Sequence, residues 1–185
     1  MRKDYEIILK LIPENSKVLD IGCSDGELIS YLENKGVSAQ GVELNQEKVI
    51  KCLEKGLDVI HGDINLIVED FPFNQFDYCL LTQTIQAVQK PDKLLNTLKK
   101  VSKNIIVSFN NSARLSKISN FLLSGSFDSL LKKADSDHWY NTDYIHPCSI
   151  KDFKKLAENL DLKIISTFDV INQRKFENGK IPSNL

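Results

Sequence analysis

Two carboxylates flank a turn that contains glycines near the start of the chain. Asp20 comes just before the turn at 22–26, and Glu43 ends the next apolar run. The residues at 18–21 have the short apolar pattern of a buried strand, and the apolar spacing after Gly26 indicates a helix. Glycine tolerates backbone conformations that let a chain approach a ligand closely. The pattern predicts a binding site for a nucleotide-like ligand that carries positive charge.

The charges around this turn distinguish between two classes of nucleotide ligand. A dinucleotide site places a pyrophosphate on a helix N-terminus and has the pattern G-x-G-x-x-G. Here three residues separate Gly22 from Gly26, and Asp20 and Asp25 would repel a pyrophosphate. S-adenosylmethionine (SAM) carries a sulfonium and an ammonium group and no phosphate. We therefore expect SAM, or its demethylated product S-adenosylhomocysteine (SAH), as the cofactor.

Other residues that follow predicted strands complete the candidate cofactor site. Glu43 is placed to accept hydrogen bonds from both ribose hydroxyls, and Asp63 is placed to accept one from the adenine amino group, with Ile64 against the adenine face. In the alternative interpretation, Asp20 and Glu43 only accept hydrogen bonds from neighbouring backbone. The predicted cofactor-binding residues are Asp20, Gly22, Cys23, Gly26, Glu43, Leu44, Asp63, Ile64, Thr82 and Gln83.

The same turn also fits a motif of a different enzyme class. Its residues read G-x-S-x-G, the nucleophile elbow of α/β-hydrolases, with Ser24 as nucleophile and His146 as a candidate triad base. That elbow normally follows several strands, one of which supplies an oxyanion-hole loop. Only one predicted helix precedes Ser24, so its position in the chain favours the cofactor interpretation.

The elements that must position these residues follow from the hydrophobic pattern. Apolar runs alternate with amphipathic stretches along most of the chain. This alternation predicts an α/β fold in which a parallel sheet has helices on both faces and ligands bind beyond the carboxyl ends of the strands. The predicted strands are 18–21, 39–44, 57–61, 76–81, 104–109 and 162–170.

Helix boundaries are expected at several capping residues. Asn45 should cap a helix whose inner face carries Val49, Cys52 and Leu53. Asn111 or Ser112 is expected to begin a later helix, and Ser149 with Asp152 has the spacing of a capping box.

Length and composition limit the function classes. A chain of 185 residues is most simply a single domain over 1–185. It has 24 basic and 25 acidic residues, which gives no electrostatic footprint for nucleic acid. No run has the length of a membrane span, and the N-terminus has no signal core. The four cysteines lack metal or disulfide spacing, so we expect a cytoplasmic protein with no metal site and no membrane partner.

One long segment, 124–147, has weak periodicity and gathers the aromatic residues Trp139, Tyr140 and Tyr144. Loops of this length in compact domains commonly serve a function, so we expect a lid or a partner-binding segment. His146 lies at its end and is the candidate catalytic base, although a histidine of this kind is commonly structural.

Several blocks of sequence together resemble the MetW family of methionine biosynthesis, within the class I SAM-dependent methyltransferase superfamily. They are the turn at 18–26, the blocks 81–88 and 106–111, and the segment 139–148. The resemblance implies a Rossmann-like sheet, a link to methionine synthesis, and homoserine O-acyltransferase as partner. The chain departs from the family in two ways. Ser24 replaces the middle glycine of the family's turn, and the sequence stops at 181–185, where the family continues into a last strand, so we expect that strand to be missing or truncated.

Two functions follow from these expectations. The first is methyl transfer from SAM to a small molecule, with Thr82, Gln83 and Thr84 facing the methyl group as in this fold. The second is a non-catalytic partner that senses SAM and activates homoserine O-acyltransferase. The chain has no Asn/Asp-Pro-Pro-Tyr motif, which argues against methylation of amides or nucleobases.

Overall fold

A computed structural model describes residues 1–128, 145–171 and 174–177. The contacts within the chain define two compact units. Unit 1 comprises Met1–Ile85 and Lys90–Ser108, and unit 2 comprises Gln86–Gln89 and Phe109–Leu185. No helix in the described ranges is long and apolar enough to cross a membrane.

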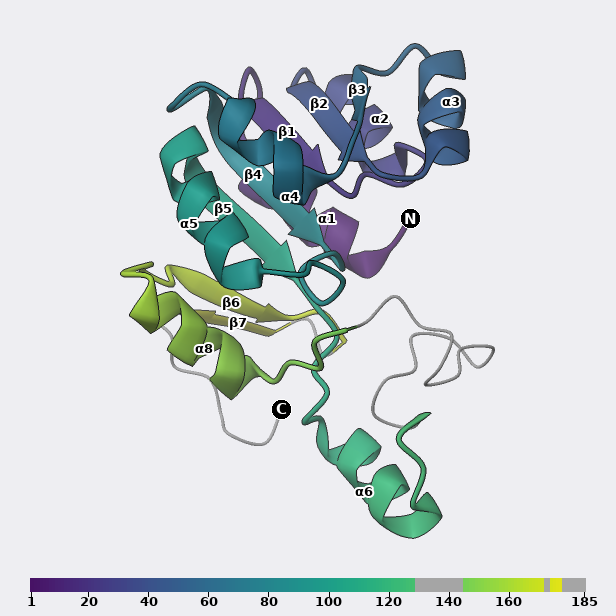
Figure 1. Ribbon diagram of the computed structural model, residues 1–185, viewed down its shortest axis with the longest axis vertical. Coiled ribbons are helices and arrows are strands. Elements are labelled where there is room, and N and C mark those ends of the chain that lie inside the picture. The colour runs from purple at the N-terminus through teal and green to yellow at the C-terminus, as the bar shows by residue number, and fades with distance from the viewer. Residues whose placement is uncertain (129–144, 172–173, 178–185) are drawn as a thin grey trace. The chain divides into compact units, whose positions relative to one another are not determined.

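Unit 1 is built on a five-stranded parallel sheet with the order β3-β2-β1-β4-β5 (Figure 1). The central strand is β1, and the order of strands along the chain reverses between β1 and β4. Open sheets of this kind bind ligands beyond the carboxyl ends of the strands at that reversal. The strands are β1 (Lys17–Ile21), β2 (Ser38–Glu43), β3 (Val59–His61), β4 (Phe76–Thr82) and β5 (Ser102–Ser108).

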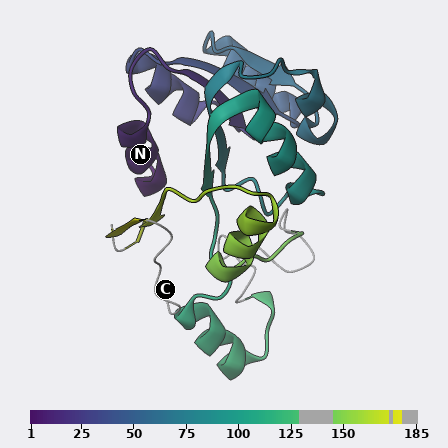
Figure 2. The same ribbon diagram turned by 90° about the vertical axis from the view of Figure 1, so that its left-hand side faces the viewer.

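Helices cover both faces of this sheet, as expected from the alternating pattern. Figure 2 shows α1 and α2 on one face and α5 on the other. Ile8, Ile29 and Leu32 pack against the strand residues Val18 and Leu80 in one buried cluster. The helices of unit 1 are α1 (Lys3–Leu11), α2 (Glu27–Asn34), α3 (Gln46–Glu54), the short α4 (Ile64–Ile67) with the 3₁₀ turn η1 (Val68–Asp70), and α5 (Pro91–Val101).

The predicted start of α3 is confirmed, and its predicted inner face is partly wrong. The side chain of Asn45 accepts hydrogen bonds from the backbone N–H groups of Glu47 and Lys48 at 3.0 and 3.2 Å. Val49 and Cys52 are buried, but Leu53 is 55% exposed. Successive residues of a helix turn by about 100°, so Leu53 lies beyond the narrow stripe that α3 presents to the sheet.

Unit 2 contains a second sheet that the sequence did not predict. Strand β6 (Ser166–Asp169) pairs antiparallel with β7 (Arg174–Glu177), and the two form a sheet of their own. A strand thus forms within the predicted range 162–170, but its expected place in the parallel sheet is wrong, because its partner is β7. Only four residues separate β6 from β7, too few for the crossover that two parallel strands need, so the two strands pair antiparallel.

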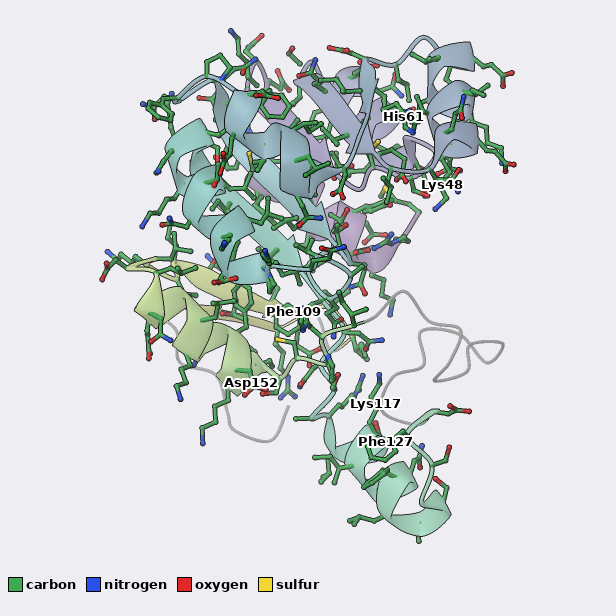
Figure 3. All side chains as sticks on the ribbon, in the orientation of Figure 1. Lys48, His61, Phe109, Lys117, Phe127 and Asp152 are labelled. Atoms are coloured by element: carbon green, nitrogen blue, oxygen red, sulfur yellow. The ribbon has the colours of Figure 1, made fainter. Side chains whose placement is uncertain are left out.

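The helices of unit 2 are α6 (Leu115–Ser124) and α8 (Ile150–Asn159). The capping box of α8 is confirmed: Ser149 Oγ accepts from the N–H of Asp152 at 3.1 Å, and Asp152 accepts in return from the N–H of Ser149 at 3.0 Å. Phe109 packs on Phe153 of this helix with ring centroids 5.2 Å apart (Figure 3).

The predicted cap of α6 is wrong. Asn111 Oδ1 accepts from the N–H of Ala113, which closes a local turn before the helix begins. Arg114 then stands at the N-cap position without a side-chain cap. Asparagine favours such turns for the same reason that it favours caps, so the two cannot be distinguished from sequence.

Candidate functional site

The turn after β1 is pressed against the loop after β4. Gly22 has a φ of +73°, and its N–H donates to the carbonyl of Val42 at 2.8 Å. A Cβ on Gly22 would lie 2.7 Å from Thr84 Oγ1, which itself donates to the carbonyl of Ile21 at 3.0 Å. The glycine is therefore required both by the left-handed backbone and by the close approach of Thr84. The sequence predicted a glycine turn at Gly22, but it did not predict that Thr84 packs against it.

Asp20 is a buried carboxyl group at the end of β1, with 1% of its surface exposed. Thr82 Oγ1, at the end of β4, lies 3.4 Å from its Oδ1 and donates to it. Burial raises the pKa of Asp20 to about 7, and the negative charge of Glu43 adds to the rise. The hydrogen bond from Thr82 and the positive charge of Arg2 oppose it. At neutral pH this carboxyl group is poised between its two protonation states, so a nearby cation would favour its ionised form.

The raised pKa of Asp20 predicts that stability falls as the pH rises. An unfolded aspartate titrates near pH 4, so between about pH 4 and 7 the folded state keeps a proton that the unfolded state has lost. The free energy of unfolding then decreases with pH across this window. Asp20→Asn should melt at a higher temperature than the wild type at pH 8 and at a similar temperature at pH 4, as followed by circular dichroism. An equal difference at both pH values would contradict this assignment.

Glu43 lies at the end of β2 with 8% of its surface exposed. One carboxylate oxygen accepts from the N–H of Ser24 and the other from the N–H of Asn45, both at 2.8 Å. The backbone contacts of the alternative interpretation are thus present. Each carboxylate oxygen has a second lone pair, so these contacts leave acceptor capacity for ribose hydroxyls. They also hold the side chain in one orientation beside the turn.

Ser24, which replaces the middle glycine of the turn in the family that the sequence resembles, adopts a φ of 55° in the left-handed region. In this region a residue with a Cβ lowers the free energy of unfolding by about 1–2 kcal/mol through steric strain. Glycine avoids this strain but costs about 0.5–1 kcal/mol because it loses more backbone entropy on folding. Ser24→Gly should therefore raise the free energy of unfolding by roughly 0.5–1 kcal/mol, measured by urea denaturation. Asn74→Gly is the matched control, since Asn74 has the same φ and asparagine tolerates it; a larger gain there would contradict the account.

Gly26 and Cys23 pack inside unit 1. A Cβ on Gly26 would collide with Leu57 and would lie 3.0 Å from Cys52 Sγ. Cys23 is 4% exposed, and burial raises the pKa of its thiol. All four cysteines of the chain are free. A predicted contact of Cys23 or Gly26 with a ligand would therefore involve backbone atoms.

Leu44, predicted to bind the cofactor, follows β2, and the two residues predicted for adenine follow β3. Leu44 is 65% exposed, and His61 Nε2 lies 3.0 Å from its carbonyl oxygen (His61 is labelled in Figure 3). Asp63 caps α4 through Oδ1, which accepts from the N–H and the side-chain amide of Asn65 at 2.9 and 2.6 Å. Its Oδ2 makes no hydrogen bond within the described part of the chain. Ile64 is buried beside it.

The start of α1 reaches the same edge of the sheet, which sequence reasoning missed. The guanidinium of Arg2 forms an ion pair with Asp4, through Nε to Oδ1 at 3.1 Å and through a second nitrogen to Oδ2. Ser108 Oγ, at the end of β5, lies 3.4 Å from Asp4 Oδ2. Asp4 and Ser108 are distant in sequence and no local motif links them, so no signal in the chain could have identified this contact.

His146, the predicted base, belongs to unit 2. Its N–H donates to the carbonyl of Gln86 at 3.0 Å, and its Nε2 lies 3.2 Å from the carbonyl oxygen of Gln89. The predicted lid or partner-binding segment lies mostly at 129–144, outside the described residues. For the hydrolase alternative, the only element that the structure places between residue 1 and β1 is the helix α1, and none of residues 1–16 forms a strand.

Sequence comparison identifies the family. The profile of methionine biosynthesis protein MetW matches residues 2–184. A bifunctional methionine biosynthesis protein MetXA/MetW from Rhodopirellula baltica is 32% identical over 170 residues, which is 87% of this chain and 27% of that protein. The chain thus spans about a quarter of the length of this relative.

Comparison with solved structures identifies the fold. A SAM-dependent methyltransferase from Archaeoglobus fulgidus matches with a TM-score of 0.64 and 19% identity, covering 89% of this chain and 73% of its own. One from Methanosarcina mazei matches with a TM-score of 0.67 and 16% identity, covering 88% and 85%. The Rossmann-like class I methyltransferase fold is therefore confirmed, and with the profile match over nearly its whole length the chain belongs to the MetW family of methionine biosynthesis proteins.

Proposed function

We propose that the protein binds SAM or SAH at the carboxyl edge of the unit 1 sheet. The observation that carries the proposal is the row of acidic groups at neighbouring strand ends: Asp63 after β3, Glu43 on β2 and Asp20 on β1. Such a row disfavours a phosphate-bearing nucleotide and suits a ligand with hydroxyls, an amino group and two cationic centres. With the ribose at Glu43, adenine lies toward Asp63 and the sulfonium toward Asp20.

The activity we propose first is methyl transfer to a small molecule. A lone pair of the acceptor attacks the methyl carbon of SAM while the carbon–sulfur bond breaks, and SAH leaves with that electron pair. The acceptor's proton passes to a base or to water, and His146 is the candidate base. The protein mainly positions the two reactants in line. The hydrogen bond from Thr84 to the carbonyl of Ile21 holds the loop after β4 beside Gly22, which supports a role for Gln83 and Thr84 in positioning the acceptor.

A second function, as a SAM-responsive activator of homoserine O-acyltransferase, is favoured by one observation. The Rhodopirellula baltica relative joins MetXA and MetW in one bifunctional protein. A covalent link keeps two parts at a high effective concentration, which is useful where they act together. SAM contains the methionine skeleton, so the amount of bound SAM would depend on how much methionine is available. Binding of SAM could in this way regulate the partner enzyme according to the methionine supply. Both functions use cytoplasmic metabolites, and we place the protein in the cytoplasm.

Three measurements on the full chain test these functions. Calorimetric titration with SAM and with SAH tests the cofactor, and no heat with either contradicts both functions. Accumulation of SAH with a panel of small nucleophilic acceptors supports methyl transfer. Stimulation of purified homoserine O-acyltransferase by the chain, altered by SAM and without SAH formation, supports the activator.

A further inference from the structure

The ion pair of Arg2 and Asp4 lies beside the proposed cofactor site, on the side of strands β4 and β5. Asp4 is 7% exposed and contacts Ser108 at the end of β5. Arg2 donates to the hydroxyl of Tyr5, whose ring belongs to the same buried cluster as Val18 of β1 and Leu80 of β4. In agreement with this position, the positive charge of Arg2 lowers the pKa of Asp20. Glu43 stands on the opposite side of β1, at the end of β2. The two charged groups therefore flank the turn at 22–26 from opposite sides.

This arrangement matches the two ends of an adenosyl amino acid. When the ribose lies at Glu43 and adenine toward β3, the amino-acid end of the ligand extends past Gly22 toward the strands β4 and β5. That end carries an ammonium and a carboxylate. Asp20 offers negative charge for the ammonium, whereas a carboxylate among these acidic residues needs a cation. Arg2 is a cation on this side of the site, because it pairs with Asp4 and Asp4 contacts Ser108 at the end of β5.

The guanidinium of Arg2 is held firmly and still has unused donors. Two of its N–H groups donate to the two oxygens of Asp4, and a third donates to the hydroxyl of Tyr5 at 3.0 Å. Its central carbon lies 4.3 Å from the centre of the Tyr5 ring. A guanidinium has five N–H donors, so two have no partner among the described residues. The Arg2 side chain is 39% exposed. Such a planar group, fixed before binding, suits a carboxylate.

We propose that Arg2 binds the α-carboxylate of SAM or SAH and that Asp4 is a positioning residue for its guanidinium. The inference rests on the proposed SAM site and deepens it. The inference predicts that tight binding depends on the amino-acid end of the ligand. Adenosyl compounds that lack the carboxylate should therefore bind more weakly.

The test compares SAM with decarboxylated SAM, which differs only by that carboxylate, in calorimetric titrations of the full chain. The wild type should bind decarboxylated SAM about 10–100-fold more weakly, as for a lost hydrogen bond between charged groups. Arg2→Gln should weaken SAM by a similar factor and leave decarboxylated SAM unchanged. Asp4→Asn should reduce the discrimination between the two ligands, a readout that a merely structural role would not move.

Lys10→Gln is the matched control. It removes the same charge from the exposed last turn of α1, about 12 Å along the helix from Arg2, and should leave both affinities unchanged. The comparison of ligands on the wild type needs no variant, so it holds even if Arg2→Gln fails to fold. Equal affinities of the wild type for both ligands, or an equal loss of both in Arg2→Gln, would overturn the role of Arg2 and leave the SAM site standing. No binding of either ligand contradicts the SAM site itself.

Discussion

Replacing Gly22 by alanine should lower the free energy of unfolding by about 2–5 kcal/mol and abolish detectable SAM binding. Two costs add at this position. The φ of +73° is strained for any residue with a Cβ, and that Cβ would lie 2.7 and 2.9 Å from the Oγ1 and Cγ2 atoms of Thr84. Thr84 cannot retreat without breaking its hydrogen bond to the carbonyl of Ile21. The substitution therefore forces apart the two loops of the proposed site. Urea denaturation and calorimetry measure the two effects.

Gly36→Ala separates the two costs. Gly36 has a similar φ of +78°, but a Cβ there would meet nothing within 4 Å. Only the backbone strain remains, so we expect a loss of about 1 kcal/mol and unchanged SAM binding. Equal losses at Gly22 and Gly36 would show that the contact with Thr84 contributes nothing.

Glu43→Gln should weaken SAM binding by about 10–100-fold, the effect of losing a hydrogen bond to a charged group. Both carboxylate oxygens accept from backbone N–H groups, those of Ser24 and Asn45. A glutamine has only one acceptor oxygen, so its NH₂ group would face one of these donors. The side chain must then turn away, and the ribose loses its acceptor. Calorimetric titration with SAM measures the change.

Glu47→Gln is the control for this prediction. Glu47 stands in the exposed first turn of the neighbouring helix α3, and the substitution removes the same charge. SAM affinity should stay within twofold of the wild type, which corresponds to about 0.4 kcal/mol. If Glu43→Gln binds SAM as tightly as Glu47→Gln does, Glu43 serves only the backbone.

Local features of the chain were predicted well because their physical causes are local. The caps at Asn45 and Ser149 depend on residues within three positions, and the structure confirms both. The first five strands are short apolar runs between turn residues, and each of them is present. Their parallel pairing follows because the intervening helices supply the crossovers that parallel strands need.

The errors arose where a long-range partner decided the outcome. The run at 162–170 has strand character, but whether it extends the main sheet or pairs elsewhere depends on β7, which has no strong apolar pattern of its own. The inner face of α3 shows the same limit. Leu53 is as apolar as Cys52, and only the packing of the helix on the sheet decides which of the two is buried.

By itself, the sequence determined the class of fold and the residues at the strand ends, because hydrophobic periodicity and glycine turns act over a few residues. Tertiary structure alone decided which groups face those residues. The contact of Asp4 with Ser108 and the closure of Thr84 on Gly22 join segments far apart in the chain. Such contacts arise from the pairing of β1, β4 and β5, which brings the carboxyl ends of distant strands to one edge of the sheet. Burial in that edge, rather than the identity of the residue, is also what raises the pKa of Asp20.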